Sequence, residues 1–307
     1  MTALSLFSVF QPFKKDEKEE KPVCLRLWNV DTFEGGKGSR SGFLKRVAGA
    51  YTKKTGVSVL VSSLTNVGAR DAFSKGDIPD LISFGIGAEY PRDYAVNLYG
   101  FNEKAFLFEE KRFAVWCKGG YFIFSKKEDF SALTDKNTVV SNGGDNLPSV
   151  ALALSGRQGK FLSMDATTAY VQFLNGKFEY MVGTQRDICR FETKGVDVHI
   201  LPIEEYLDLY QCVSVTSSAY TAESVEFVRF LLSEEMQKGL TSIGMASALY
   251  PIYSQGETQS LMEKCTADYA PPSFVGKTEL DELKKECEKA LLLADCTALK
   301  KFLKSGR

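Results

Sequence analysis

Histidine is nearly absent from this sequence of 307 residues, which limits the chemistry that the protein can perform. The single histidine, His199, lies in a stretch of strand composition. Because histidine most often transfers protons near neutral pH, its scarcity disfavours most acid–base and nucleophilic mechanisms. Asp31 and Glu34 come nearest to a catalytic carboxylate pair, but two acids this close in one loop are usually solvated. We therefore expect no catalytic residues and no enzymatic activity.

Metal-binding and disulfide patterns are also missing. The seven cysteines are an odd number, and no two of them form a Cys-x-x-Cys pair. This distribution disfavours a zinc site and a complete disulfide framework, so we expect most of the thiols to be small buried hydrophobes. We expect neither a metal site nor a cofactor.

The charges are balanced and the apolar runs are short. The 38 basic and 39 acidic side chains give a formal net charge of -1, so we expect no nucleic-acid partner. Residues 3–10 form an apolar run, far below the ~20 residues of a membrane-spanning helix. The run resembles the tail of a signal or anchor segment, although no positive region precedes it. We expect residues 1–23 to be a leader or tether and the protein to be exported.

Strand and helix patterns alternate over the rest of the chain. Val57, Val59 and Val61 alternate with other residues as in a strand, and an apolar face recurs at helical spacing over residues 43–51. This alternation predicts an α/β protein with parallel sheets. The length exceeds that of one domain, and Gly119 and Gly120 separate two extended segments. We therefore expect two lobes that face each other across a cleft.

Four segments carry a resemblance to a known family. They are Leu25-x-Leu-Trp28, Lys53-Lys-Thr-Gly56-Val, Ile78-Pro-Asp-Leu81 and Phe230-Leu-Leu-Ser233-x-x-Met-Gln237-x-x-Leu240-x-x-x-Gly244. In this order and spacing they resemble the extracellular solute-binding proteins of ABC transporters, and most closely the carbohydrate-binding group that includes maltose-binding protein. The resemblance covers residues 24–250 and, more loosely, the helical tail.

This resemblance implies a two-lobed α/β fold of the periplasmic-binding-protein type II, with a ligand cleft between lobes joined by a hinge. Lobe 1 would comprise residues 24–115 and 213–249, and lobe 2 residues 116–212 and 250–307. Such a monomer would deliver a small polar ligand, often a sugar, to the transmembrane subunits of an ABC permease. It would lie outside the cytoplasm, tethered to the outer face of the cytoplasmic membrane. A sensor module that presents ligand to a membrane kinase or chemoreceptor is the alternative.

The loops that follow the strands should form the cleft walls. Sugars are bound by aromatic faces and by a few well-placed polar groups, so Trp28 and Trp116 would be either stacking platforms or partly buried in a lobe core. In Gly183-Thr-Gln-Arg-Asp187, Arg186 and Asp187 can pair with each other, and Gln185 or Arg186 can also reach the ligand. If the ligand is an anion, Arg40, Arg186 and the loop Asn142-Gly-Gly-Asp-Asn146 would hold it. The candidate ligand-binding residues are Trp28, Asp31, Glu34, Arg40, Asn66, Ser83, Trp116, Asn142, Asp145, Gln185, Arg186, Asp187 and Tyr250.

Overall fold

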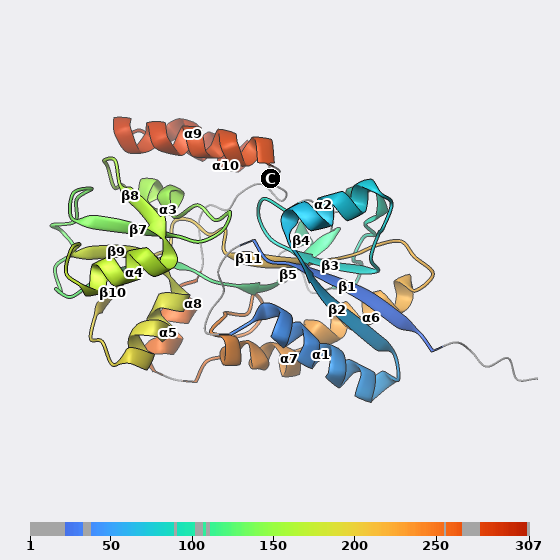
Figure 1. Ribbon diagram of the computed structural model, residues 1–307. Helices are drawn as coiled ribbons and strands as arrows, with labels where there is room; N and C mark the ends of the chain where they lie inside the picture. Colours follow the sequence, from blue (N-terminus) through green and yellow to red (C-terminus); the bar gives the residue numbers. More distant parts are fainter. Residues whose placement is uncertain are drawn as a thin grey trace, which may run out of the picture.

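Two mixed sheets lie side by side in the computed structural model, which describes residues 22–32, 38–88, 91–101, 107–108, 111–254, 256–265 and 277–305 (Figure 1). The first sheet has the order β2-β1-β3-β11-β5-β4 and the second the order β10-β6-β9-β7-β8. Each sheet with its helices forms one lobe. The predicted two-lobed α/β fold is therefore confirmed.

The first sheet is parallel in one half and antiparallel in the other. β1 (Cys24–Val30) pairs in parallel with β2 (Ser58–Leu64) and β3 (Leu81–Phe84). β11 (Tyr210–Val215) runs antiparallel to β3 and to β5 (Phe113–Lys118), and the short β4 (Leu107–Phe108) pairs with β5. A strand from residues 210–215 therefore lies in the middle of a sheet whose other strands all come from residues 24–118.

The second sheet follows the same plan. β7 (Thr138–Asn142) pairs in parallel with β8 (Leu162–Asp165) and with β9 (Tyr180–Thr184). β6 (Tyr121–Ser125) runs antiparallel to β9, and β10 (His199–Ile203) runs antiparallel to β6. The carboxyl ends of the three parallel strands thus lie at one edge of the sheet, and their amino ends at the opposite edge.

Helices cover both lobes, and local sequence signals set their ends. α1 (Arg40–Thr55) starts where Ser39 Oγ accepts a hydrogen bond from Gly42 N (3.1 Å), and it ends at Gly56 in the left-handed conformation, φ 80°. Lobe 1 also carries α2 (Asn66–Ser74), α6 (Thr221–Leu231), α7 (Glu234–Lys238) and two short 3₁₀ turns, Arg92–Tyr94 and Gly239–Ile243. Lobe 2 carries α3 (Pro148–Leu154), α4 (Ala166–Leu174), α5 (Gln185–Lys194) and α8 (Glu257–Glu263).

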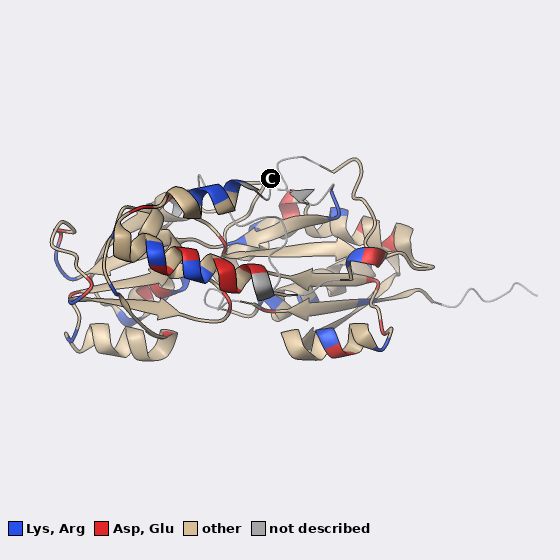
Figure 2. Ribbon diagram, turned by 90° about the horizontal axis from the view of Figure 1, so that it is seen from above, with Lys and Arg blue, Asp and Glu red and all other residues tan. Residues whose placement is uncertain are grey.

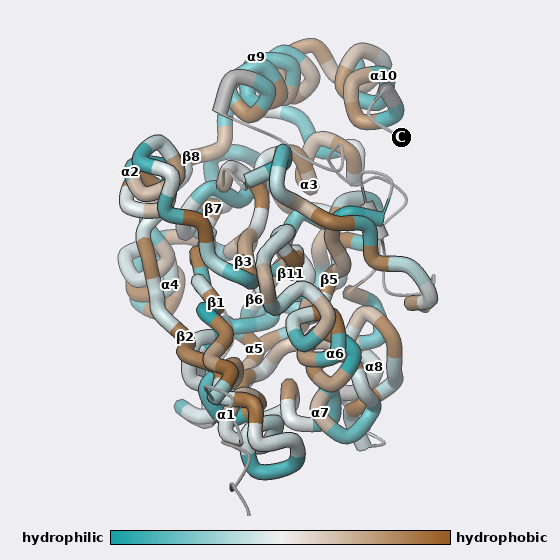
Figure 3. The backbone as a smooth tube through the Cα atoms, turned by 90° about the vertical axis from the view of Figure 1, so that its right-hand side faces the viewer, coloured by the Kyte–Doolittle hydropathy of each residue, from teal (hydrophilic) through white to brown (hydrophobic). Residues whose placement is uncertain are grey.

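The two C-terminal helices, α9 (Lys277–Leu293) and α10 (Thr297–Ser305), lie together above lobe 2, next to α3 (Figures 1 and 3). Leu280, Leu283, Cys287 and Leu291 of α9 are buried, whereas Figure 2 shows both signs of charge along its outer side. α9 is therefore an amphipathic helix that packs on the body of the protein. None of the helices among the described residues is long and apolar enough to span a membrane.

The chain passes between the lobes at three places. After β5 it crosses at Gly119 and Gly120, between β10 and β11 it returns, and beyond the return Ala246 pairs with Lys118. Gly119 packs against the amide of Gln185, where an added Cβ would come within 2.3 Å of Oε1, so only glycine fits at this crossing. The expected boundary after residue 115 falls inside β5, so we propose Gly119–Gly120 in its place. The assignment of the remaining segments to the two lobes stays a proposal.

A buried carboxylate fixes the return crossing. Asp208 accepts hydrogen bonds from Tyr121 Oη (2.5 Å) and Tyr206 Oη (3.1 Å), and from Leu147 N (2.7 Å) at the start of α3. Burial raises the pKa of Asp208 to about 6, although these three donors lower it. The segment between β10 and β11 is thereby held to the body of lobe 2.

Candidate functional site

The candidate site lies where the parallel strands of both lobes end. Asp145, in the loop after β7, accepts a hydrogen bond from Asn66 Nδ2 (3.0 Å), and its own N–H donates to Thr32 O (2.7 Å) after β1. Gly87, after β3, also approaches Asp145 closely. Three loops of lobe 1 therefore meet one residue of lobe 2, at the edges where open α/β sheets bind ligands. The structure brings together two predicted site residues, Asn66 and Asp145.

Buried polar atoms without hydrogen-bond partners gather around this seam. Among the residues that the structure describes, they include Thr32 Oγ1, Asn66 Oδ1, Asn142 Oδ1 and Asn146 Oδ1. Asn29, the second-last residue of β1, is fully buried, and neither its Oδ1 nor its Nδ2 has a hydrogen-bond partner among the described residues. Because most buried polar groups in proteins are hydrogen-bonded, these exceptions are typical of a place that receives a polar ligand or ordered water.

Two further predicted site residues, Asp31 and Arg40, belong to lobe 1. Asp31 and Arg40 form an ion pair of 2.8 Å, in which Arg40 is almost fully buried and the Asp31 side chain is 44% exposed. Arg40 is the first residue of α1, so its charge lies at the positive end of the helix dipole. Glu34 lies outside the described residues.

The lobe 2 side is built by α5, a helix that sequence analysis missed. Residues 183–187 were expected to form a loop, but α5 starts at Gln185. Thr184 and Asp187 form a capping box, in which Asp187 Oδ2 accepts from Thr184 N (3.1 Å). Burial raises the pKa of Asp187, and Arg190 pairs with its Oδ1 at 3.2 Å. The spacing Thr184-x-x-Asp187, with Gly195 as the C-terminal cap, could have identified the helix.

An open pocket of about 500 Å³ lies between α5 and Gly38 of lobe 1. The described residues that line it from lobe 2 are Tyr170, Arg186, Cys189, Arg190, Thr193 and Lys194. Desolvation lowers the pKa of Arg186, and the neighbouring charge of Arg190 lowers it further. Arg186 also lines a small cavity of about 10 Å³ at the ends of β7 and β9, together with Asn146. Sequence analysis missed Tyr170, Arg190 and Lys194, because their approach depends on the unrecognised helix.

The two tryptophans are not available as stacking platforms in this structure. Trp116 is fully buried, stacks on Phe43 at a ring distance of 5.5 Å and donates to Ser83 Oγ (3.0 Å). Trp28 is 6% exposed and stacks on Phe73 of α2. We therefore correct the interpretation of Trp28, Trp116 and Ser83: they pack the core of lobe 1.

Other predicted residues lie apart from the pocket. Gln185 is fully buried and accepts from Gly120 N (3.1 Å), so it packs the first crossing. Tyr250 lines a separate pocket of about 240 Å³ next to Lys118. Asn142 lines a third pocket of about 660 Å³ between α3 and α9. Within the described part of the chain, no group of three or more His, Cys, Asp or Glu side chains is arranged to hold a metal ion.

No protein-family model matches the sequence, and a search of curated proteins finds no match. Solved structures match the fold over most of the chain. A putative extracellular solute-binding protein from Bordetella parapertussis aligns with a TM-score of 0.64 at 14% identity, covering 86% of this chain and 97% of its own. The GacH receptor of Streptomyces glaucescens aligns with a TM-score of 0.62 at 15% identity, covering 94% and 100%. Iron-bound HitA from Pseudomonas aeruginosa aligns with a TM-score of 0.57 at 19% identity, covering 88% and 99%.

These matches define the fold as that of the periplasmic binding proteins. At these identities the likeness shows the fold alone. The Streptomyces receptor was solved in complex with acarbose and the Pseudomonas protein with iron, so one architecture accommodates very different solutes. The ligand of this chain must therefore be inferred from its own residues.

Proposed function

We propose that the protein is an extracytoplasmic solute-binding protein that captures a small polar ligand between its lobes and delivers it to an ABC permease. The observation that carries this proposal is the seam at Asp145, where the carboxyl ends of parallel strands from both lobes meet through side-chain and backbone hydrogen bonds. Open and closed states that differ by a few kcal/mol would let a ligand select the closed one.

A carbohydrate or a compound of similar size and polarity is the ligand that we propose. The pocket between Gly38 and α5, at about 500 Å³, lies within the usual range of small-molecule sites. Arginine, tyrosine and threonine side chains line it and provide donors and acceptors that can pair with hydroxyl groups. The similar fold of the GacH receptor, which was solved in complex with acarbose, supports this choice.

A thermal-shift screen tests the capture of a solute. A ligand that binds only the folded state raises the melting temperature, so at least one member of a panel of sugars, sugar acids and polyamines should do so. Small-angle scattering of the same mixtures would then report closure. If no compound changes either the melting temperature or the scattering profile, the proposal is wrong.

The proposed location outside the cytoplasm is tested separately. The intact native protein should be found in the membrane or extracellular fraction, held by the segment before residue 24. Recovery of the intact protein only from the cytosol would contradict this part of the proposal.

A further inference from the structure

Three basic side chains follow one face of α5. Arg186, Arg190 and Lys194 are four residues apart, so they lie above one another along the helix and line the pocket that faces Gly38. Lys194 is exposed, Arg190 is 23% exposed, and Arg186 is half-buried. These are the only charged side chains among the described residues that line this pocket.

The positions of these basic side chains lower the stability of α5. Arg186 lies in the first turn of α5, where the helix dipole disfavours a positive charge. It is also one turn from Arg190, and like charges at this spacing repel. Asp187 pairs with Arg190 and caps the helix, but it is buried behind the pocket. Positive charge that weakens a helix at the rim of a ligand cleft is typical of a functional site.

Arg190 is held in place by contacts that use only some of its N–H donors. Its Nη1 donates to Ala166 O (3.3 Å) and to Asp187 Oδ1 (3.2 Å), and its guanidinium stacks over the Tyr170 ring at 5.1 Å. Its Nη2 and Nε make no hydrogen bond within the part of the chain that the structure describes, and the same holds for Tyr170 Oη. A pre-positioned guanidinium with free N–H groups is suited to an oxyanion, which it can bind in a bidentate way.

We propose that the pocket between Gly38 and α5 receives an anionic group of the solute, a carboxylate or a phosphate, which Arg190 and Arg186 bind and Lys194 attracts at the rim. This inference rests on the proposed function, because it names the class of solute that the cleft captures. The ligand is then an acidic polar compound of the size of a sugar acid or a sugar phosphate, and neutral sugars are discriminated against because they cannot form charge-assisted hydrogen bonds with the guanidinium of Arg190.

The test compares acids with their neutral counterparts in calorimetric titrations and thermal shifts. The probes are galacturonate and glucose 6-phosphate, with galactose and glucose as the neutral partners. We expect one of the acids to bind at least tenfold more tightly than its neutral partner, because charge-assisted hydrogen bonds are the stronger ones. Its affinity should fall as sodium chloride rises from about 0.05 M to about 0.5 M. A preference for galacturonate would identify a carboxylate, and a preference for glucose 6-phosphate a phosphate.

The chain offers closely matched control variants. Arg190→Lys keeps the charge beside Asp187 but removes the guanidinium fork, and should weaken binding of the acid roughly tenfold or more. Arg229 makes equivalent contacts on α6: an ion pair with Glu226 (3.2 Å), bonds to the carbonyls of Gly100 and Tyr99, and stacking over Phe101 at 4.5 Å. It lines none of the pockets described above, so Arg229→Lys should leave the affinity unchanged.

Lys194→Gln provides a second test at an exposed position that tolerates substitution. It should weaken binding of the acid several-fold, whereas Lys45→Gln, at an exposed position of α1, should not. Circular dichroism and the melting temperature without ligand would establish that all variants are folded.

The outcomes separate this inference from the proposed function. Equal binding of acids and neutral sugars, or equal losses in Arg190→Lys and Arg229→Lys, would overturn the anionic assignment. Binding of neutral sugars alone would overturn it too, while capture of a solute would stand. If neither class of probe binds and the wider panel also fails, the proposed function itself is wrong.

Discussion

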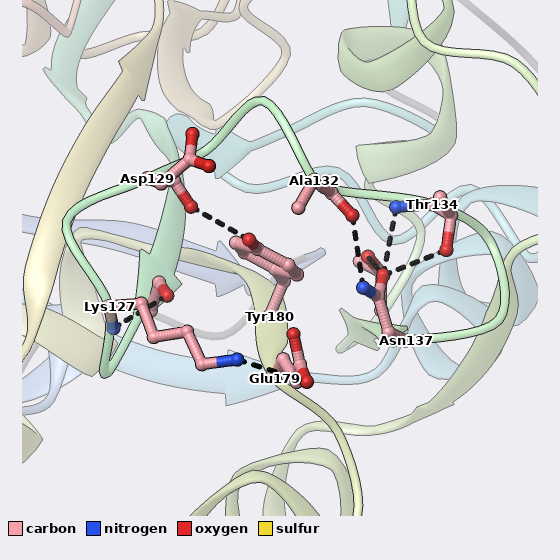
Figure 4. A network of polar contacts seen from close by, with 9 residues as sticks. Lys127, Asp129, Ala132, Thr134, Asn137, Glu179 and Tyr180 are labelled. Carbon is pink, nitrogen blue, oxygen red and sulfur yellow. Dashed lines mark hydrogen bonds and ion pairs between the residues drawn. The ribbon is translucent and has the colours of Figure 1, made fainter.

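The two ends of the parallel strands in lobe 2 use polar residues in opposite ways. Before β7, Asn137 Oδ1 accepts from Thr134 N (2.8 Å), and its Nδ2 donates to Ala132 O (3.0 Å) (Figure 4). Tyr180, at the start of β9, donates to Asp129 O (2.7 Å). At this end the side-chain donors and acceptors are satisfied inside the lobe.

At the carboxyl ends of the same strands, some polar groups are not satisfied. Asn142 Oδ1 and Asn146 Oδ1 are buried without a partner among the described residues, and Arg186 and Arg190 line an open pocket. One sheet therefore has a structural edge and an edge at which we propose that the ligand binds. The difference teaches that unsatisfied polar groups, rather than polar groups as such, mark the candidate site in this lobe.

The largest expected effect is a loss of unfolding free energy in the core of lobe 1, with which the effects at both edges of the lobe 2 sheet can be compared. Trp116→Ala should cost about 3–5 kcal/mol of unfolding free energy, because the ring is fully buried and stacks on Phe43. Urea unfolding measures this loss. The affinity of the folded variant for a solute should stay unchanged. A variant that keeps its stability but loses its ligand would show that Trp116 is part of the site after all.

The next largest effect is on the pH dependence of stability, and it concerns Asp208. Like the residues at the amino ends of the strands, Asp208 has hydrogen-bond partners within the lobe, but its side chain can ionise. Burial raises the pKa of Asp208 from 3.8 to about 6, so the folded state keeps a proton that the unfolded state has already lost. Stability should therefore fall by about 3 kcal/mol as the pH rises from about 4 to about 6. Asp208→Asn should remove this slope in urea unfolding, whereas Asp71→Asn, on the surface, should not. An unchanged slope in Asp208→Asn would refute the assignment.

A pair of asparagines tests the comparison directly. Asn137→Ala should lower stability by about 1–3 kcal/mol and leave solute affinity unchanged, because it removes several hydrogen bonds at the structural edge. Asn146→Ala should lower stability less and should weaken binding, because only its Nδ2 has a protein partner, Tyr121 Oη (3.2 Å), whereas its Oδ1 has none and it lines the small cavity beside Arg186. Thermal unfolding and titration of both variants with the same solute measure the contrast. Equal stability losses would remove the distinction between the edges.

The smallest expected effect is at the seam between the lobes. Asp145→Ala removes the hydrogen bond to Asn66 Nδ2, which contributes about 0.5–1.5 kcal/mol to closure. The unliganded variant should have a larger radius of gyration in scattering than the wild type. Asp135→Ala, which loses a bond from Lys160 N in the loop before β7, is the matched control and should not expand. Expansion of both variants, or of neither, would contradict the role of the seam.

The class of fold could be predicted from the sequence, because the sequence patterns that indicate it are local and repeated. Alternating valines over β2, the capping Ser39 and Gly56 of α1, and the Gly119–Gly120 crossing each appear within a few residues. The order of the strands depends on long-range pairing: β11 enters the sheet between β3 and β5, far from its own neighbours in sequence. No local pattern encodes that insertion.

Only part of the candidate site could be predicted from the sequence, because burial decides which polar and aromatic residues can reach a ligand. The structure brings Asn66 and Asp145 together at the seam, since both follow strand ends, and their role in binding stays a prediction. Trp116 also lies near a strand end, but the face of the sheet on which its ring lies is covered by α1. The capping box at Thr184 and Asp187 was present in the sequence, and reading it would have placed Arg186, Arg190 and Lys194 on one helix face.

Small-angle scattering of the wild-type protein is the most direct test of the central claim, that two lobes close on a polar solute at the carboxyl ends of their strands. The measurement compares the free protein with the protein saturated by whichever panel compound raises the melting temperature most. We expect the radius of gyration to fall when that compound binds. Identical profiles with and without a compound that stabilises the protein would contradict the claim.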